Sequence, residues 1–92
     1  MITAFVMVHA DADRIPETAQ AIADLDGVAE VYSCAGDVDL IAVVRVTEHE
    51  QLADVIAGGL SKVTGVRHTS THIAFRSYSS RDEATAFSVG LD

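Results

Sequence analysis

The sequence Leu25-Asp26-Gly27-Val28 recurs in form at Val63-Thr64-Gly65-Val66, and each copy closes an amphipathic stretch and opens an apolar run. Glycine after a helical pattern is typical of the left-handed residue that ends a helix, because glycine has no Cβ to clash. Valine directly after the glycine favours the start of a strand. The two copies therefore predict a chain that folds as strand–helix–strand twice over, which is the split βαβ pattern.

Four apolar runs predict strands at residues 2–8, 28–35, 38–46 and 66–76, with a helix in each long interval. Asp13 is expected to cap the first helix, and Thr47-Glu48-His49-Glu50 has the form of a capping box for the second. The second helix would then contain Gly58-Gly59 and end at Gly65. The first and third runs are apolar at nearly every position, which is typical of central strands, whereas the second and fourth are mixed.

The mixed runs are therefore expected at the edges of the sheet. With right-handed crossovers, the prediction is an α+β, ferredoxin-like βαββαβ sandwich with an antiparallel sheet in the order 4-1-3-2. Both helices then cover one face, and the other face has apolar side chains but no cover from this chain. Because exposed apolar patches usually mark interfaces, we expect a homodimer with sheet face against sheet face.

Composition narrows the class of protein. The 92 residues suit one domain, and the formal net charge of −8 includes only six Lys and Arg. Without clustered cations, direct binding of nucleic acid or of an anionic membrane is disfavoured. No run reaches the length of a membrane span, no basic leader opens the chain, and Cys34 has no partner for an internal disulfide. These features predict a cytoplasmic location.

The turn Gly36-Asp37-Val38-Asp39-Leu40 combines a glycine with two carboxylates, so it could bind a small ligand. An ammonium group on a ligand needs a carboxylate, and a carboxylate on a ligand needs N–H donors. Asp37 or Asp39 suits the first need, and the backbone amides around Val38 suit the second, since Gly36 permits close approach. The same Gly-Asp pair is equally typical of an ordinary hairpin turn, so the residues alone leave both interpretations open.

Other polar residues give weaker indications. Thr69 and Thr71 share one face of the fourth strand and are candidates to line a ligand cleft, as is Tyr32 on the second strand. His68 and His72 lie roughly 13 Å apart along a strand, too far to share one metal ion. No spacing matches a nucleophile–base pair or a phosphate-binding loop, so no catalytic residue, metal or cofactor is expected.

Three of these motifs together resemble the effector domain of the Lrp/AsnC regulators, also called the RAM domain. They are the turn at Gly36 to Leu40, the Gly65-Val66 helix ending and the Thr69-Ser70-Thr71 run. The resemblance covers roughly residues 2–76, so the chain divides into an effector-binding domain at 1–76 and a C-terminal tail at 77–92. We expect a short helix within residues 81–87 of the tail.

The resemblance implies dimers that assemble further, often as a ring of four dimers, with an amino acid bound between neighbouring dimers. It places the ligand beside the turn, at Gly36, Asp37, Val38 and Asp39. The family's regulators carry a helix-turn-helix domain before the sheet domain, whereas here the first strand follows Met1 at once. The expectation is a stand-alone effector domain that does not touch DNA itself and that modulates transcription, alone or with a full-length relative.

Two alternatives share the predicted architecture, and fold does not decide between them. One is a small dimeric ferredoxin-like enzyme of monooxygenase or isomerase type, and the other is an ACT-like amino-acid-binding module. An enzyme needs a roomy pocket with a convergent histidine, whereas a sensor can fill its core with aliphatic side chains. The abundance of Val, Ile and Ala, the Gly36 turn and the threonine-rich strand favour the Lrp/AsnC interpretation, and we predict that the chain is not an enzyme.

Overall fold

The computed structural model describes residues 1–80, which form one four-stranded antiparallel sheet and two α-helices. The elements are β1 (Ile2–Ala10), α1 (Ile15–Ala23), β2 (Val28–Ser33), β3 (Leu40–Val46), α2 (His49–Ile56) and β4 (Val66–Ile73). Short 3₁₀ helices, η1 (Ala12–Arg14) and η2 (Leu60–Lys62), precede α1 and follow α2. The strand order β2-β3-β1-β4 confirms the predicted order 4-1-3-2, seen from the opposite edge. The short helix expected within residues 81–87 lies outside the described residues.

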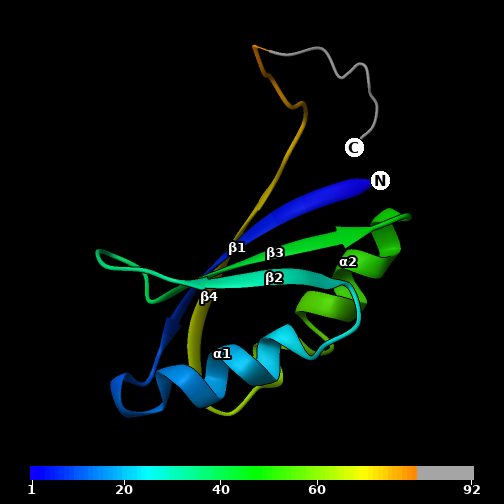
Figure 1. Ribbon diagram of the computed structural model, residues 1–92. Coiled ribbons are helices and arrows are strands. Elements are labelled where there is room, and N and C mark those ends of the chain that lie inside the picture. The colour runs from blue at the N-terminus through cyan, green and yellow to red at the C-terminus, as the bar shows by residue number, and fades with distance from the viewer. Residues whose placement is uncertain (81–92) are drawn as a thin grey trace.

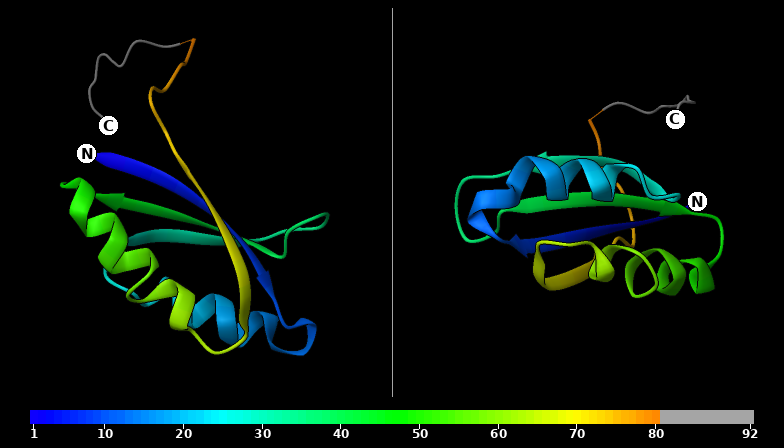
Figure 2. Two further views of the ribbon diagram at one scale, coloured as in Figure 1. Left: turned by 180° about the vertical axis from the view of Figure 1, so that it is seen from behind. Right: turned by 90° about the horizontal axis from the view of Figure 1, so that it is seen from below.

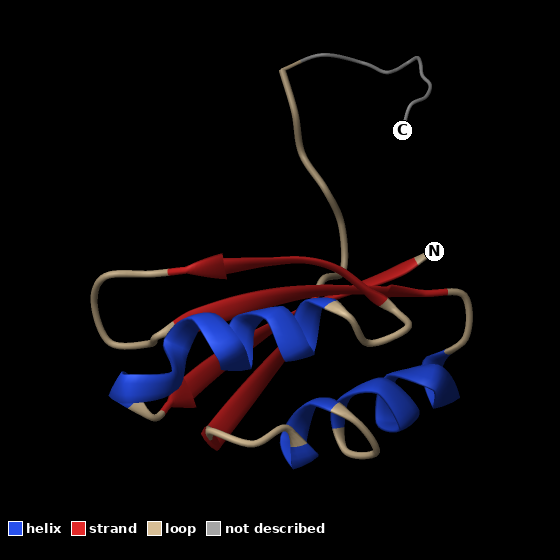
Figure 3. Ribbon diagram, turned by 60° about the horizontal axis from the view of Figure 1, so that its bottom comes forward, coloured by secondary structure: helices blue, strands red, loops and turns tan. Residues whose placement is uncertain are grey.

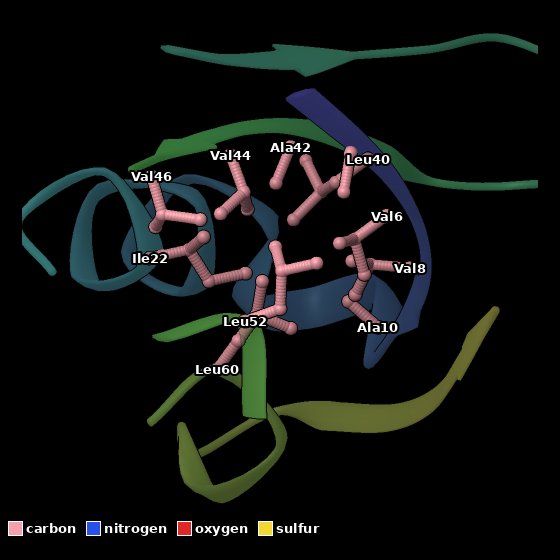
Figure 4. Packing of buried hydrophobic residues seen from close by; sticks show 11 residues of the cluster. Val6, Val8, Ala10, Ile22, Leu40, Ala42, Val44, Val46, Leu52 and Leu60 are labelled. Atoms are coloured by element: carbon pink, nitrogen blue, oxygen red, sulfur yellow. The ribbon is translucent and has the colours of Figure 1, made fainter. Parts of the chain in front are cut away.

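Both helices lie on one face of the sheet, as predicted (Figure 1; Figure 2). The strands alternate accordingly, because successive side chains point to opposite faces. Along β1, every second residue from Ala4 to Ala10 is buried against the helices. Figure 4 shows these side chains meeting Ile22 of α1, Leu52 of α2 and Leu60 of η2 in a single aliphatic cluster. The core therefore fills the space between the sheet and the helices.

The opposite side of the sheet, called the open face below, is covered by no helix of the described residues (Figure 3). The alternation places on it the side chains of Thr3, Phe5, Met7, His9, Glu30, Tyr32, Ile41, Val43, Arg45, His68, Ser70 and His72. Phe5 is 38% exposed and Tyr32 is 53% exposed. The two central strands thus present apolar side chains to both sides, although within residues 1–80 the helices cover only one side.

Gly65 shows why the repeated sequence decides the fold. Its φ is +99°, in the left-handed region that favours glycine. A Cβ at this position would lie 2.2 Å from Oγ1 of Thr18, which is buried and donates a hydrogen bond to the Thr64 carbonyl at 3.1 Å. Gly27 has a similar φ of +95°, and β2 and β4 each begin directly after their glycine.

The predicted helix ends and caps need correction. Helix α2 ends at Ile56, so Gly58 and Gly59 lie outside it and Gly65 follows η2 rather than a helix. Two adjacent glycines each disfavour a helix by about 1 kcal/mol relative to alanine, which explains the early end.

The capping box also lies one residue later than predicted. The N-cap of α2 is Glu48, whose N–H donates to Oε1 of Gln51 at 2.8 Å. Helix α1 begins after Arg14 rather than after Asp13, and Asp13 belongs to η1. Among the described residues, no helix has both the length and the apolar character that crossing a membrane requires.

Candidate functional site

The connection between β2 and β3, residues 34–39 and called the loop below, is the predicted binding turn. It is longer than a two-residue hairpin, and the Cys34 N–H closes its base by donating to the Asp39 carbonyl at 2.9 Å. Gly36 has a φ of +128°, and a Cβ there would meet no atom within 4 Å. Gly36 is therefore needed for backbone conformation and not for close packing within the subunit.

Asp39 ties the loop to the end of β1. Its N–H donates to the Val8 carbonyl at 2.9 Å, and its Oδ2 accepts a hydrogen bond from the Ala10 N–H at 2.8 Å. The register of β1 against β4 shifts between His9 and Ala10, so the Asp39 carboxylate satisfies a backbone donor next to the irregularity. Asp37, by contrast, is exposed near the tip of the loop. The two carboxylates thus have different positions: Asp39 braces the loop and Asp37 faces outward.

Thr69 and Thr71 lie on edge strand β4, as predicted. They are paired in register with Val8 and Val6, whose side chains are buried beneath the helices, so both threonines lie on the helix side of the sheet. Thr69 is half-buried and Thr71 is exposed. Because Asp39 also contacts Val8, the structure places the base of the loop one strand away from Thr69.

Tyr32 lies on the opposite edge strand, β2, and on the open face. Its hydroxyl donates a hydrogen bond to the Glu30 carboxylate, and this bond and the charge of Glu30 raise the pKa of Tyr32 above its ordinary value. With two strands between β2 and β4, Tyr32 and Thr69 are about 14 Å apart across the sheet, on opposite faces. One subunit therefore does not bring all the predicted site residues together.

The structure also reveals a histidine pair that the sequence analysis missed. His9 of β1 lies opposite His68 of β4, and their ring centroids are 5.6 Å apart. The His9 Nδ1 atom is buried without a hydrogen-bond partner in the described part of the chain. The residues are far apart in sequence, and only the antiparallel pairing of β1 with β4 would have indicated this contact. Within residues 1–80, no group of three or more His, Cys, Asp and Glu is arranged to hold a metal ion.

Two half-open hollows lie away from the loop. One, of about 370 Å³, lies between the end of α1 and helix α2, and its walls include Asp26, Gln51, Asp54 and Val55. The other, of about 480 Å³, lies between the open face and residues 74–78. Neither hollow is lined by a histidine, so neither has the feature that the enzyme alternative requires.

Comparisons with known proteins agree with this geometry. The model of the Lrp/AsnC ligand binding domain matches residues 3–84. The crystal structure of TTHA0845 from Thermus thermophilus is 46% identical, with a TM-score of 0.81 over 86% of this chain and 99% of that chain. The uncharacterized HTH-type transcriptional regulator PH1916 of Pyrococcus horikoshii is 34% identical over 76 residues, which are 79% of this chain and 51% of the regulator.

A third relative shares the fold alone. The regulator NMB0573 of Neisseria meningitidis, solved as a complex with L-Met, is 16% identical with a TM-score of 0.73, over 82% of this chain and 50% of that one. The chain spans about half the length of the curated regulators that it matches. Their names place them among transcriptional regulators. The match of the family model over most of the sequence shows that the chain belongs to the Lrp/AsnC ligand-binding domain family.

Proposed function

We propose that this chain is an effector-binding and self-assembling domain that modulates transcription in the cytoplasm, and that its effector is an amino acid bound beside the loop. The observation that carries the proposal is the different positions of the Asp39 and Asp37 carboxylates. Asp39 braces the loop through the Ala10 N–H, whereas Asp37 is exposed near the tip. A carboxylate on a braced loop suits an ammonium group, and the backbone amides around Val38 suit the ligand's carboxylate.

The remaining predicted site residues support a site that is shared between subunits. Thr69 and Thr71 lie on β4, Tyr32 lies on β2, and these strands form opposite edges of the sheet. In a ring of four dimers, the loop of one subunit lies beside an edge of a neighbour, and the ligand fills the cleft between them. The L-Met complex of the Neisseria regulator supports an amino acid as the class of ligand, since that protein has the same fold.

The dimer that builds such a ring forms through the open face. Phe5, Met7, Ile41 and Val43 give this face an apolar centre at β1 and β3, and the described helices all lie on the other side. A small domain buries limited surface alone, so pairing two such faces adds a second hydrophobic layer. The open face is therefore the surface on which a second copy packs.

The domain reaches DNA through a partner and not through its own surface. Its formal net charge is −8, and few cations are available to replace counterions on a phosphate backbone. The curated relatives are HTH-type regulators about twice as long as the matched region. Co-assembly with a full-length relative of this kind would couple effector binding here to DNA binding there.

The test combines light scattering with thermal unfolding, on the protein alone and with each of the twenty amino acids. We expect an oligomer larger than a dimer whose size or melting temperature responds to at least one amino acid, because a ligand that binds only the folded state stabilises it. Asp37→Asn should weaken that response at least tenfold. Asp13→Asn, at another exposed aspartate, in η1, is the matched control and should respond like the unmodified protein. Indifference to all twenty amino acids would overturn the proposed effector class.

A further inference from the structure

Residues 74–80, called the arm below, leave the sheet at the end of β4. The Ala74 N–H donates to the Thr3 carbonyl at 2.9 Å, which continues the pairing of β4 with β1 by one step. Beyond this bond the chain rises from the sheet on the side away from the helices (Figure 1; Figure 3). The arm therefore stands on the same side as the open face.

The arm exposes two aromatic side chains completely or nearly so. Phe75 is 102% exposed and Tyr78 is 85% exposed. Of the six exposed large hydrophobic side chains in the described residues, four line the hollow between the arm and the open face: Met1, Phe5, Phe75 and Tyr78. Aromatic rings of this size contribute strongly to interfaces when buried, and contiguous exposed apolar groups usually mark an interaction surface.

The arm does not fold flat onto its own sheet. A half-open hollow of about 480 Å³ separates the two, lined on the sheet side by Met1, Thr3, Phe5 and Arg45 and on the other side by residues 74–78. Packed sheets stand about 10 Å apart, so a second sheet laid on the open face would run alongside a segment that rises from it. The hollow is therefore continuous with the surface on which the second copy is proposed to pack.

We propose that the arm is exchanged between two copies of this chain: each arm crosses to the partner and buries Phe75 and Tyr78 against it. The second copy is the favoured occupant because the arm, the hollow and the apolar centre of the open face form one continuous surface. A two-fold axis through that face relates the two subunits, so both arms cross the same interface. The hollow of each subunit is then filled by residues of the other subunit. This inference rests on the proposed dimer and adds to it the segment that secures it.

The chain contains no tryptophan, so Phe75→Trp places a single fluorescent reporter on the arm. At concentrations where light scattering reports a dimer, we expect the emission to be blue-shifted, as for a buried indole. Dilution to the monomer, or Ile41→Asp on the open face, should return it to the solvent-exposed value, because Ile41 is only half-buried within the subunit. Ala21→Trp, at an exposed position on α1, is the control and should be insensitive to Ile41→Asp.

A second pair of variants tests whether the arm contributes to affinity. Phe75→Ser with Tyr78→Ser should raise the dimer dissociation constant at least tenfold and leave the unfolding of the diluted monomer unchanged. Phe75→Leu with Tyr78→Phe keeps the apolar groups and should dimerise nearly as the unmodified protein does.

The outcomes separate the two proposals. A dimer of the Phe75→Trp variant whose indole stays solvent-exposed at every concentration would overturn arm exchange and leave the dimer standing. An indole that is already buried in the monomer of this variant would show that the arm folds back onto its own chain, which also overturns exchange. A chain that remains monomeric at every concentration would overturn the proposed dimer itself.

Discussion

The two faces of the sheet are built from the same strands but differ in how far their side chains are buried within the subunit. On the helix side, alternate residues of β1 are small aliphatics that are almost fully buried within the chain. On the open face, the intervening residues of β1 include Phe5 and Met7, which are only partly buried. Within residues 1–80, helices cover one face of the sheet and none covers the other, on which we propose that a second copy packs. A similar difference separates Asp39, which accepts a hydrogen bond from the Ala10 N–H, from Asp37, which is exposed.

The largest effect is expected from adjacent residues of β3 that point to opposite faces. Leu40 has no exposed surface, so Leu40→Ala should lower the free energy of unfolding by about 2–5 kcal/mol, through lost burial and a residual cavity. Ile41 is half-buried on the open face, so Ile41→Ala should cost less in the isolated subunit and should mainly weaken dimerisation. Urea unfolding at one low protein concentration and light scattering on dilution measure the two effects. Equal losses of stability would contradict the difference between the faces.

Gly65 and Gly36 provide a second comparison, since both have positive φ but only one is packed. Placing alanine in the left-handed region costs about 1–2 kcal/mol at either position. At Gly65 the new Cβ also meets Thr18 Oγ1, so Gly65→Ala should lower the free energy of unfolding by about 3 kcal/mol in all. Gly36→Ala should lower it only by the backbone contribution of about 1–2 kcal/mol.

The double variant Gly65→Ala with Thr18→Ala isolates the packing contribution. It should lose less stability than the two single variants added together, because Thr18→Ala removes the atom that clashes. Additive losses in urea unfolding would show that backbone strain alone accounts for Gly65.

Asp39 and Asp37 test the same division within the loop. Asp39→Ala leaves the Ala10 N–H without its acceptor and should cost about 1–3 kcal/mol. From the sequence alone, Asp39→Ala is expected to weaken effector binding with little loss of fold, and the bond to Ala10 changes that expectation. Asp37→Ala should leave urea unfolding unchanged and affect only the response to the effector. A loss of stability in the Asp37→Ala variant would show that Asp37, like Asp39, makes a stabilising contact within the subunit.

The parts of the fold that could be predicted depend on patterns within short stretches of the sequence. The glycines at 27 and 65 indicate the element order, and the apolar character of β1 and β3 indicates the central strands. Right-handed crossovers then place both helices on one face of the sheet. The helix ends were less predictable, because Thr47 and Glu48 begin overlapping patterns that differ by one residue and only one forms. The set of candidate site residues stays a prediction, and the sequence did not indicate how these residues are arranged. The bond of Asp39 to Ala10 joins residues 29 apart, and the His9–His68 contact exists only after β1 and β4 pair.

The smallest effect is expected at Tyr32, where two groups on the open face bind each other. The Tyr32 hydroxyl donates to the Glu30 carboxylate, and losing its proton would place a phenolate beside that negative charge, so Glu30 raises the pKa of Tyr32. Glu30→Gln should therefore lower this pKa towards its ordinary value of 10.0. Titration of phenolate absorbance measures it in a Tyr78→Phe background, because the chain has two tyrosines. An unchanged pKa would mean that Glu30 and Tyr32 are not paired in solution. In that case Tyr32, like Phe5, would be a side chain of the open face whose partner lies outside the subunit.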